Sequence, residues 1–130
     1  MMIATKGRNA LKVMLDLAQH NDGSFISLAD IAERVRESQK YLETTVAALS
    51  GAGLILSARG KLGGYKLARK PDEYTVAEII TAAEGSLAPV ACLDGKCENA
   101  DKCLSLPLFK ELDEVIMNFL NSKTLADLLK

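Results

Sequence analysis

The chain has 130 residues, of which 48% are hydrophobic and 25% are charged, a balance that predicts one globular unit with a modest core. No apolar run approaches the roughly 18–20 residues that a membrane-spanning helix needs. The N-terminus lacks a signal-peptide pattern, so we expect a cytoplasmic protein that does not contact a membrane.

The net charge of −1 hides an asymmetry along the chain. The first 70 residues carry 11 Lys and Arg against 6 Asp and Glu, whereas the remaining 60 carry 5 against 11. A basic half joined to an acidic half is typical of a protein that binds a polyanion. Chance asymmetry in a short chain is the alternative interpretation.

Apolar residues at helical spacing predict a first helix over residues 6–20. Asn21-Asp22-Gly23 is expected to end it, because glycine readily takes a positive φ. His20, the only histidine, falls in the last turn, where an imidazolium meets the negative end of the helix dipole. We therefore interpret His20 as structural rather than as metal-binding or catalytic.

Two short helices joined by a tight turn are predicted next. Ser27 is the N-cap of a helix that ends near Arg36, and Ser38 is the N-cap of a helix that runs to about Ala52. This layout predicts a helix-turn-helix, although plain helical hairpins share it. The exposed early positions of the second helix carry side chains that hydrogen-bond base edges and phosphates, namely Gln39, Lys40, Glu43 and Thr44.

A cationic hairpin is predicted directly after these helices. Strands are expected over residues 54–57 and 65–69, and the loop between them holds three glycines and two cations. This order is typical of a winged helix, whose hairpin reaches backbone phosphates or the minor groove. An ordinary glycine-rich turn is the alternative. The candidate DNA-binding residues of this wing are Arg59, Gly60, Lys61, Gly63 and Gly64.

Thr75 is predicted to cap a short helix that closes at Gly85, and residues 86–103 then show neither helical nor strand periodicity. A long helix is expected from about Ser105 to Asn121. Its apolar stripe is wide enough to need two partners, so we expect a second subunit to cover part of it. Packing within one subunit only is the alternative.

All three cysteines, Cys92, Cys97 and Cys103, lie in this irregular connection. Their odd number excludes a disulfide set that uses all of them, and clustered cytosolic cysteines favour metal binding or redox chemistry. Structural zinc usually draws a tight Cys-x-x-Cys pair, whereas gaps of four and five residues suit a bulkier iron–sulfur cluster. Zinc and a direct thiol switch remain as alternatives.

Nearly the whole chain resembles the Rrf2 family of bacterial winged-helix transcription regulators. That family includes regulators of iron–sulfur cluster biogenesis, of the nitric oxide response and of cysteine metabolism. The resemblance rests on Thr5-Lys6-Gly7-Arg8, Lys40-Tyr41-Leu42-Glu43, Gly53-Leu54-Ile55, Arg59-Gly60, Gly63-Gly64-Tyr65-Lys66-Leu67-Ala68, Glu84-Gly85, the three cysteines, and Thr124-Leu125-Ala126-Asp127-Leu128-Leu129.

The resemblance implies a mainly α fold with a small β-hairpin wing (α+β). Residues 1–84 would form the winged helix-turn-helix, residues 85–104 a sensor loop, and residues 105–130 a dimerisation helix and tail. A homodimer would bind a palindromic operator in double-stranded DNA, and the predicted DNA-binding set gains Lys6, Ser38 and Tyr41.

The resemblance also implies that Cys92, Cys97 and Cys103 hold a [2Fe-2S] or [4Fe-4S] cluster. The family's fourth ligand is either a His shortly after the third cysteine or an acidic residue near the partner's N-terminus. Residues 104–110 contain no His, and the N-terminal positions offer Arg8 and Lys12. This gap favours a cluster with one exchangeable coordination site.

These observations predict a DNA-binding regulator, for instance a repressor, that senses redox, iron–sulfur or nitric oxide status. The alternative is a family regulator of cysteine metabolism that works without a cluster, through a metabolite, a partner enzyme or direct thiol oxidation. An enzyme is disfavoured, because the sequence offers no acid–base pair and no nucleotide-binding loop.

Overall fold

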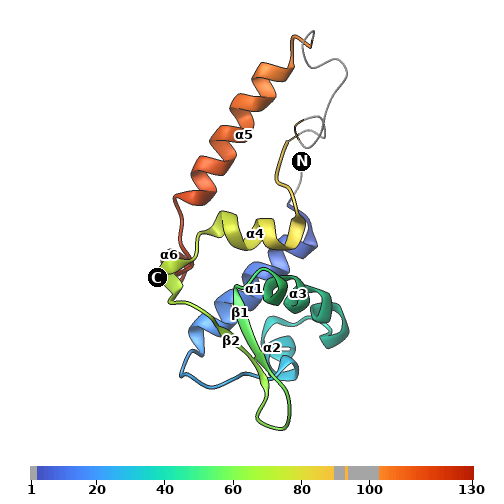
Figure 1. Cartoon of the computed structure of the whole chain (residues 1–130), viewed down its shortest axis with the longest axis vertical. Helices are drawn as coiled ribbons and strands as arrows, with labels where there is room; N and C mark the ends of the chain where they lie inside the picture. Colours follow the sequence, from blue (N-terminus) through green and yellow to red (C-terminus); the bar gives the residue numbers. More distant parts are fainter. Residues whose placement is uncertain (1–2, 90–92, 94–102) are drawn as a thin grey trace.

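The computed structural model describes residues 3–89, 93 and 103–130. These residues are mainly helical and include one two-stranded antiparallel hairpin, which confirms the predicted fold class. Figure 1 shows helices packed around the base of the hairpin, with α5 extending away from them. The elements are α1 (Thr5–Gln19), α2 (Leu28–Val35), α3 (Gln39–Gly51), β1 (Ile55–Ala58), β2 (Gly64–Leu67), η1 (Pro71–Glu73), α4 (Val76–Glu84), α5 (Leu106–Asn121) and α6 (Leu125–Leu128). No helix in this part of the chain is long and apolar enough to cross a membrane.

Helix α1 supplies one wall of the main core. Its buried stripe includes Val13, Met14 and Leu17, which lie in one cluster with buried side chains of α2, α3 and α4. At Gly7 the helix comes so close to α4 that an added Cβ would lie 3.0 Å from the Ile80 side chain. Glycine at this position therefore allows α1 and α4 to pack closely.

Side-chain caps begin three helices where the sequence predicts them. The Ser27 hydroxyl accepts the Asp30 N–H at 3.2 Å, and the Ser38 hydroxyl accepts the Tyr41 N–H at 3.1 Å. Thr75 caps α4 in the same way. Between α2 and α3 the chain turns at Arg36, which takes a left-handed conformation with φ 61°.

The hairpin pairs Ile55 with Leu67 at its base and Ala58 with Gly64 at its tip. Both strands are offset from the predicted ranges of 54–57 and 65–69. At the base, Leu54 and Ala68 keep one long bond of 3.4 Å, and the Tyr74 hydroxyl bonds the Leu54 carbonyl and the Arg69 N–H.

Tyr74 is fully buried, and its hydroxyl joins both ends of the hairpin. The hydroxyl donates to the Leu54 carbonyl at 2.6 Å and accepts the backbone N–H groups of Ala68 and Arg69, each at 2.9 Å. The Arg69 guanidinium lies over the Tyr74 ring and binds both carboxylate oxygens of Glu78, at 2.7 and 3.0 Å. Burial raises the pKa of Tyr74, so the neutral hydroxyl that makes these bonds is favoured.

The backbone around Tyr74 also holds the C-terminal segment. Its carbonyl accepts the Leu125 N–H at 3.0 Å, and the Val76 N–H donates to the Lys123 carbonyl at 2.8 Å. The end of α5 and the start of α6 are thus bonded to the same short stretch that anchors the hairpin. The capping box that begins α6, formed by Thr124 and Asp127, was not predicted.

Replacement of Tyr74 by Phe would leave the Arg69 N–H without a partner. It would also remove the hydroxyl's bonds to the Leu54 carbonyl and the Ala68 N–H, which would keep only their own 3.4 Å bond to each other. We expect Tyr74→Phe to lose about 2–3 kcal/mol of unfolding free energy, measured by urea denaturation. Tyr41→Phe is the matched control, because the Tyr41 side chain is exposed, and it should change stability by less than about 0.5 kcal/mol. Equal stability of the two variants would contradict the role assigned to the buried hydroxyl.

Gly64 allows the hairpin to pair with the loop before α2. Ile26 and Tyr65 exchange two backbone hydrogen bonds of 2.8 Å, and a Cβ at Gly64 would lie 2.1 Å from the Ile26 carbonyl oxygen. We expect Gly64→Ala to lose about 2 kcal/mol or more and to expose the Ile26 and Tyr65 amides to hydrogen exchange. Gly60→Ala is the control, since Gly60 also has a positive φ but faces open space. If the Ile26 and Tyr65 amides stay protected from hydrogen exchange in Gly64→Ala, the close approach at Gly64 is not needed for this pairing.

Candidate nucleic-acid interface and sensor segment

Helix α3 turns its predicted DNA-binding side chains toward solvent. Gln39, Lys40, Glu43 and Thr44 are all exposed, whereas Leu42, Val46 and Leu49 on the other side are buried in the core. The exposed face also includes the N-cap Ser38 and Tyr41. The helix therefore presents its N-terminal half to a ligand while its apolar side fixes it to the head.

A groove of about 520 Å³ separates α3 from the wing. It brings Gln39 and Glu43 of α3 together with four predicted wing residues, Arg59, Gly60, Gly63 and Gly64. Lys40, Thr44 and Lys61 do not line it. Its remaining walls are Ser27, Leu28, Ser57, Ala58 and Tyr65, none of which was predicted as a site residue.

Ser27 shows why part of this groove escaped prediction. Its sequence context indicates a helix cap, and the hydroxyl does cap α2. A signal was nevertheless available, because the start of the first helix of a helix-turn-helix lies beside the DNA backbone. Tyr65 was predicted as a strand residue and not as a site residue, and the structure places it at the groove beside Gly64.

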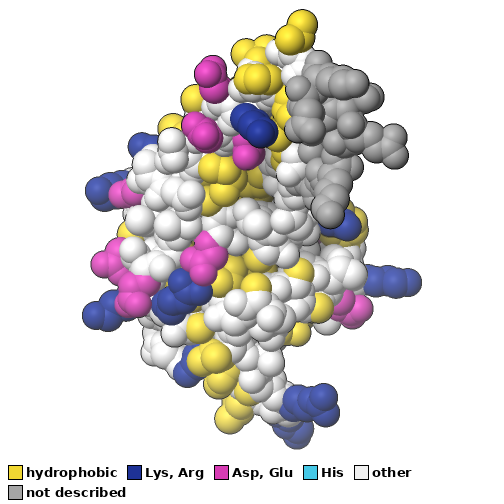
Figure 2. Space-filling view, turned by 45° about the horizontal axis from the view of Figure 1, so that its top comes forward, with side chains coloured by type: hydrophobic (Ala, Val, Ile, Leu, Met, Phe, Trp, Pro, Cys, Tyr) yellow, Lys and Arg dark blue, Asp and Glu magenta, His cyan; other side chains and the backbone are white. Residues whose placement is uncertain are grey.

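The wing carries two cations without acidic partners. Arg59 and Lys61 are exposed and form no ion pair with any described residue. Figure 2 shows Lys and Arg side chains gathered at the end of the molecule that the wing forms. Lys66 differs, because its ammonium lies 4.7 Å from the centre of the Phe25 ring. Unpaired cations at an exposed tip are suited to neutralise phosphates.

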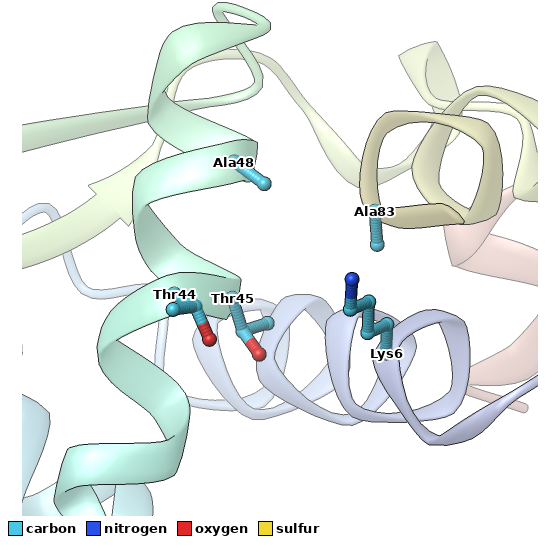
Figure 3. Close-up of a pocket in the computed structure, with 5 residues that line it drawn as sticks. All are labelled: Lys6, Thr44, Thr45, Ala48 and Ala83. Carbon is cyan, nitrogen blue, oxygen red and sulfur yellow. The ribbon is translucent and has the colours of Figure 1, made fainter. Parts of the chain in front are cut away.

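Lys6, which the family resemblance adds to the predicted DNA-binding set, lies on the other flank of α3. With Thr44, Thr45, Ala48 and Ala83 it lines a cleft of about 120 Å³ between α1, α3 and α4 (Figure 3). At 100° per residue, this side of α3 is opposite the side that faces the wing. Thr45 was not predicted as a site residue, because its position follows the buried face of the helix.

Cys103 is the one predicted cluster ligand within the described residues, since Cys92 and Cys97 lie outside them. Its sulfur lies 3.2 Å from the Ser105 hydroxyl oxygen, just before α5 begins. Hydrogen bonds from the Ser105 side chain, and from the backbone N–H groups of Ser105 and Leu106, hold the pKa of Cys103 below its ordinary value. The thiolate is the form that binds iron, so this environment fits a cluster ligand.

No group of three or more His, Cys, Asp or Glu side chains suited to a metal occurs in the described part of the chain. The three-cysteine ligand set therefore stays a prediction. His20 is not near such a group, and its Nδ1 lies 2.9 Å from the Asp16 carbonyl oxygen in the last turn of α1. This contact agrees with the structural role that the sequence predicts for His20.

Helix α5 is apolar on two sides. On one side Leu120, Ile116 and Met117 pack against α4, where they join a second core cluster. The other side is exposed, with Leu108, Leu112, Val115 and Phe119 between 43% and 65% accessible. Figure 2 shows exposed hydrophobic side chains along the part of the surface that α5 forms.

Comparisons with known proteins agree with this arrangement. A family model described as "Rrf2: Iron-dependent Transcriptional regulator" matches residues 3–130. The HTH-type transcriptional regulator IscR of Serratia proteamaculans (strain 568) is 42% identical over 130 residues, which are 98% of this chain and 79% of the relative.

Two solved structures have the same fold. The IscR structure of T. potens is 37% identical, with a TM-score of 0.79 and coverage of 99% of this chain and 86% of that chain. CymR (YrzC), the global cysteine regulator of B. subtilis, is 39% identical, with a TM-score of 0.75 and coverage of 99% and 96%. These relatives are named as regulators of transcription or metabolism and not as enzymes. The chain belongs to the Rrf2 family of winged-helix transcriptional regulators.

Proposed function

We propose that the protein is a homodimeric, cytoplasmic DNA-binding regulator whose DNA affinity depends on an iron–sulfur cluster held by Cys92, Cys97 and Cys103. The observation that carries this proposal is the environment of Cys103, which favours the thiolate at the point where the chain enters α5. The match to a family described as iron-dependent supports it.

A bound cluster would supply a centre that responds to redox state and nitric oxide, and its assembly requires thiolate ligands. The residues of the protein would transmit the state of the cluster to α5. The Leu106 N–H bonds the Cys103 carbonyl at 3.4 Å, so the cysteine is joined to the first turn of α5. Ordering or releasing the segment before α5 would therefore change how that helix is held.

The proposed homodimer places two α3 helices on one duplex. They would enter successive major grooves about 34 Å apart, which requires a palindromic operator. Each α3 would read bases through exposed side chains such as Gln39 and Glu43, while Arg59 and Lys61 of the wing bind phosphates. A change in how α5 pairs with its partner would alter the spacing of the two helices.

The exposed face of α5 is the proposed dimer interface. We expect Val115→Asp to produce a monomer, because a buried unpaired carboxylate opposes association across the two-fold axis. Size-exclusion chromatography with light scattering measures this directly. Leu62→Asp is the control, since Leu62 is 91% exposed on the wing and should leave the dimer unchanged. A Val115→Asp protein that stays dimeric would place the interface elsewhere.

The cluster is tested by anaerobic purification of the protein, with absorbance spectra and iron and sulfide analysis. We expect a coloured protein, and we expect Cys103→Ser to retain less iron and sulfide than the parent. Operator affinity should differ between the cluster-containing and iron-free forms of the parent protein. It should not differ between matched preparations of the triple variant Cys92→Ala, Cys97→Ala, Cys103→Ala. An iron response that survives in the triple variant would refute the sensor.

A second candidate function is regulation of cysteine metabolism without a cluster. The similarity to CymR favours it, and so does the lowered pKa of Cys103, since a thiolate is also the form that oxidants attack. A colourless, iron-free protein whose DNA binding responds to peroxide through Cys103 would favour this alternative over the cluster.

A further inference from the structure

The cleft between α1, α3 and α4 has walls that leave space for a small group. Lys6 comes from the first turn of α1, Thr45 and Ala48 from α3, and Ala83 from α4. Figure 3 shows Thr45 and Ala48 projecting from α3 toward the other two helices, with the Lys6 amine across from them beside Ala83. The alanine walls explain why no side chain fills the cleft.

Thr45 has a polar group that the described structure leaves unused. The side chain is only 5% exposed, and its hydroxyl forms no hydrogen bond with any described residue. Thr44 differs, because its hydroxyl already donates to the Tyr41 carbonyl at 3.0 Å. Within the described residues, Asn9 Nδ2 is the one unpartnered side-chain N or O atom sealed from solvent, so the Thr45 hydroxyl keeps access to the cleft. A mostly buried side chain thus offers one unpaired hydroxyl to the cleft, where a ligand could bond it.

The charge of the cleft favours an anion. Lys6 is exposed and forms no ion pair with a described residue, and no acidic side chain lines the cleft. The first turn of α1 also contains no acid. Glu84, which follows Ala83, turns its carboxylate to the backbone N–H of Ala4. A ligand in the cleft would therefore meet one ammonium and one free hydroxyl donor, and a phosphate oxygen accepts from both.

The position of the cleft identifies the source of the phosphate. A helix that lies in the major groove has a phosphate backbone on each side of it. The wing borders the flank of α3 that carries Gln39 and Glu43, and the cleft borders the opposite flank. We propose that one DNA backbone phosphate binds in this cleft, held by the Lys6 ammonium and the Thr45 hydroxyl. The inference rests on the proposed reading of DNA by α3 and adds Thr45 to that interface.

The test uses the full-length protein and the duplex that it selects from a random-sequence library. Single phosphates of that duplex are replaced by neutral methylphosphonates, one position at a time. We expect one position in each half-site where the wild-type protein loses about tenfold in affinity. At that position Lys6→Gln and Thr45→Val should cause little further loss, whereas at other positions their losses should add.

Two further measurements distinguish the role of Lys6 from that of Thr45. Lys6→Gln should reduce the salt slope of binding by about 0.9 per protomer, and Thr45→Val should weaken binding without changing the slope. Thr45→Val should not lower the unfolding free energy, because no described residue bonds this hydroxyl. Lys130→Gln is the charge-matched control, since Lys130 pairs with Asp127 at the C-terminus, and it should bind as the wild type does.

Absence of any position coupled to both variants, with wild-type binding intact, would overturn the cleft and leave the proposed function standing. A wild-type protein that selects no duplex would count against the proposed function itself. Addition of inorganic phosphate at constant ionic strength tests whether the cleft binds free phosphate instead of a DNA phosphate. We expect inorganic phosphate to shift the unfolding temperatures of the wild type and of Lys6→Gln equally. A larger rise in the wild type would assign the cleft to free phosphate and overturn the DNA assignment.

Discussion

The buried Tyr74 hydroxyl is the interaction on which the placement of the wing depends. A two-stranded hairpin has too little core of its own to hold a fixed position. Here its two ends are joined by one hydroxyl that bonds three backbone groups, and the Arg69–Glu78 pair fixes the same point to α4. Gly64 adds a second attachment nearer the tip, through the bonds that Ile26 and Tyr65 exchange. The strands of the wing are thus fixed at two points, which set where the cationic loop leaves them relative to α3.

The sequence predicted the parts of the fold that depend on local chemistry. Ser27, Ser38 and Thr75 begin their helices as expected, because a cap needs only a side chain and an N–H three residues away. The ends of the hairpin strands differ from the predicted ranges by one or two residues. The base of the hairpin is set by Tyr74, whose hydroxyl bonds a carbonyl 20 residues away, and no short pattern encodes such a contact. The same holds for Thr45, which reads as interior until α1 and α4 are placed around it.

The sequence predicted which residue types form the candidate DNA interface, but only part of how they are arranged. Exposed polar residues of α3 and the glycine-rich cationic loop could be identified from pattern alone. The structure adds that Gln39 and Glu43 face the wing, whereas Thr44 faces the cleft that contains Lys6. Helical geometry puts these residues on opposite sides of α3, and the packing of α1 decides which side borders the cleft. The packing of α1 depends on the tertiary structure, so local sequence patterns do not predict it. The cysteine ligand set was implied by the family resemblance, and the spacing favoured a cluster over zinc; within the described residues only Cys103 could be compared with that prediction.

The bonds that hold the end of α5 beside Tyr74 have a geometric consequence. Helix α5 has 16 residues, so it is a rod about 24 Å long. The chain that leaves it is fixed to the base of the wing through Lys123 and Leu125, and its other end begins next to Cys103. A tilt of about 10° about the fixed end would carry the Cys103 end through about 4 Å. A displacement of several ångströms at the Cys103 end would therefore correspond to only a small rotation of α5 at the end that lies beside the wing.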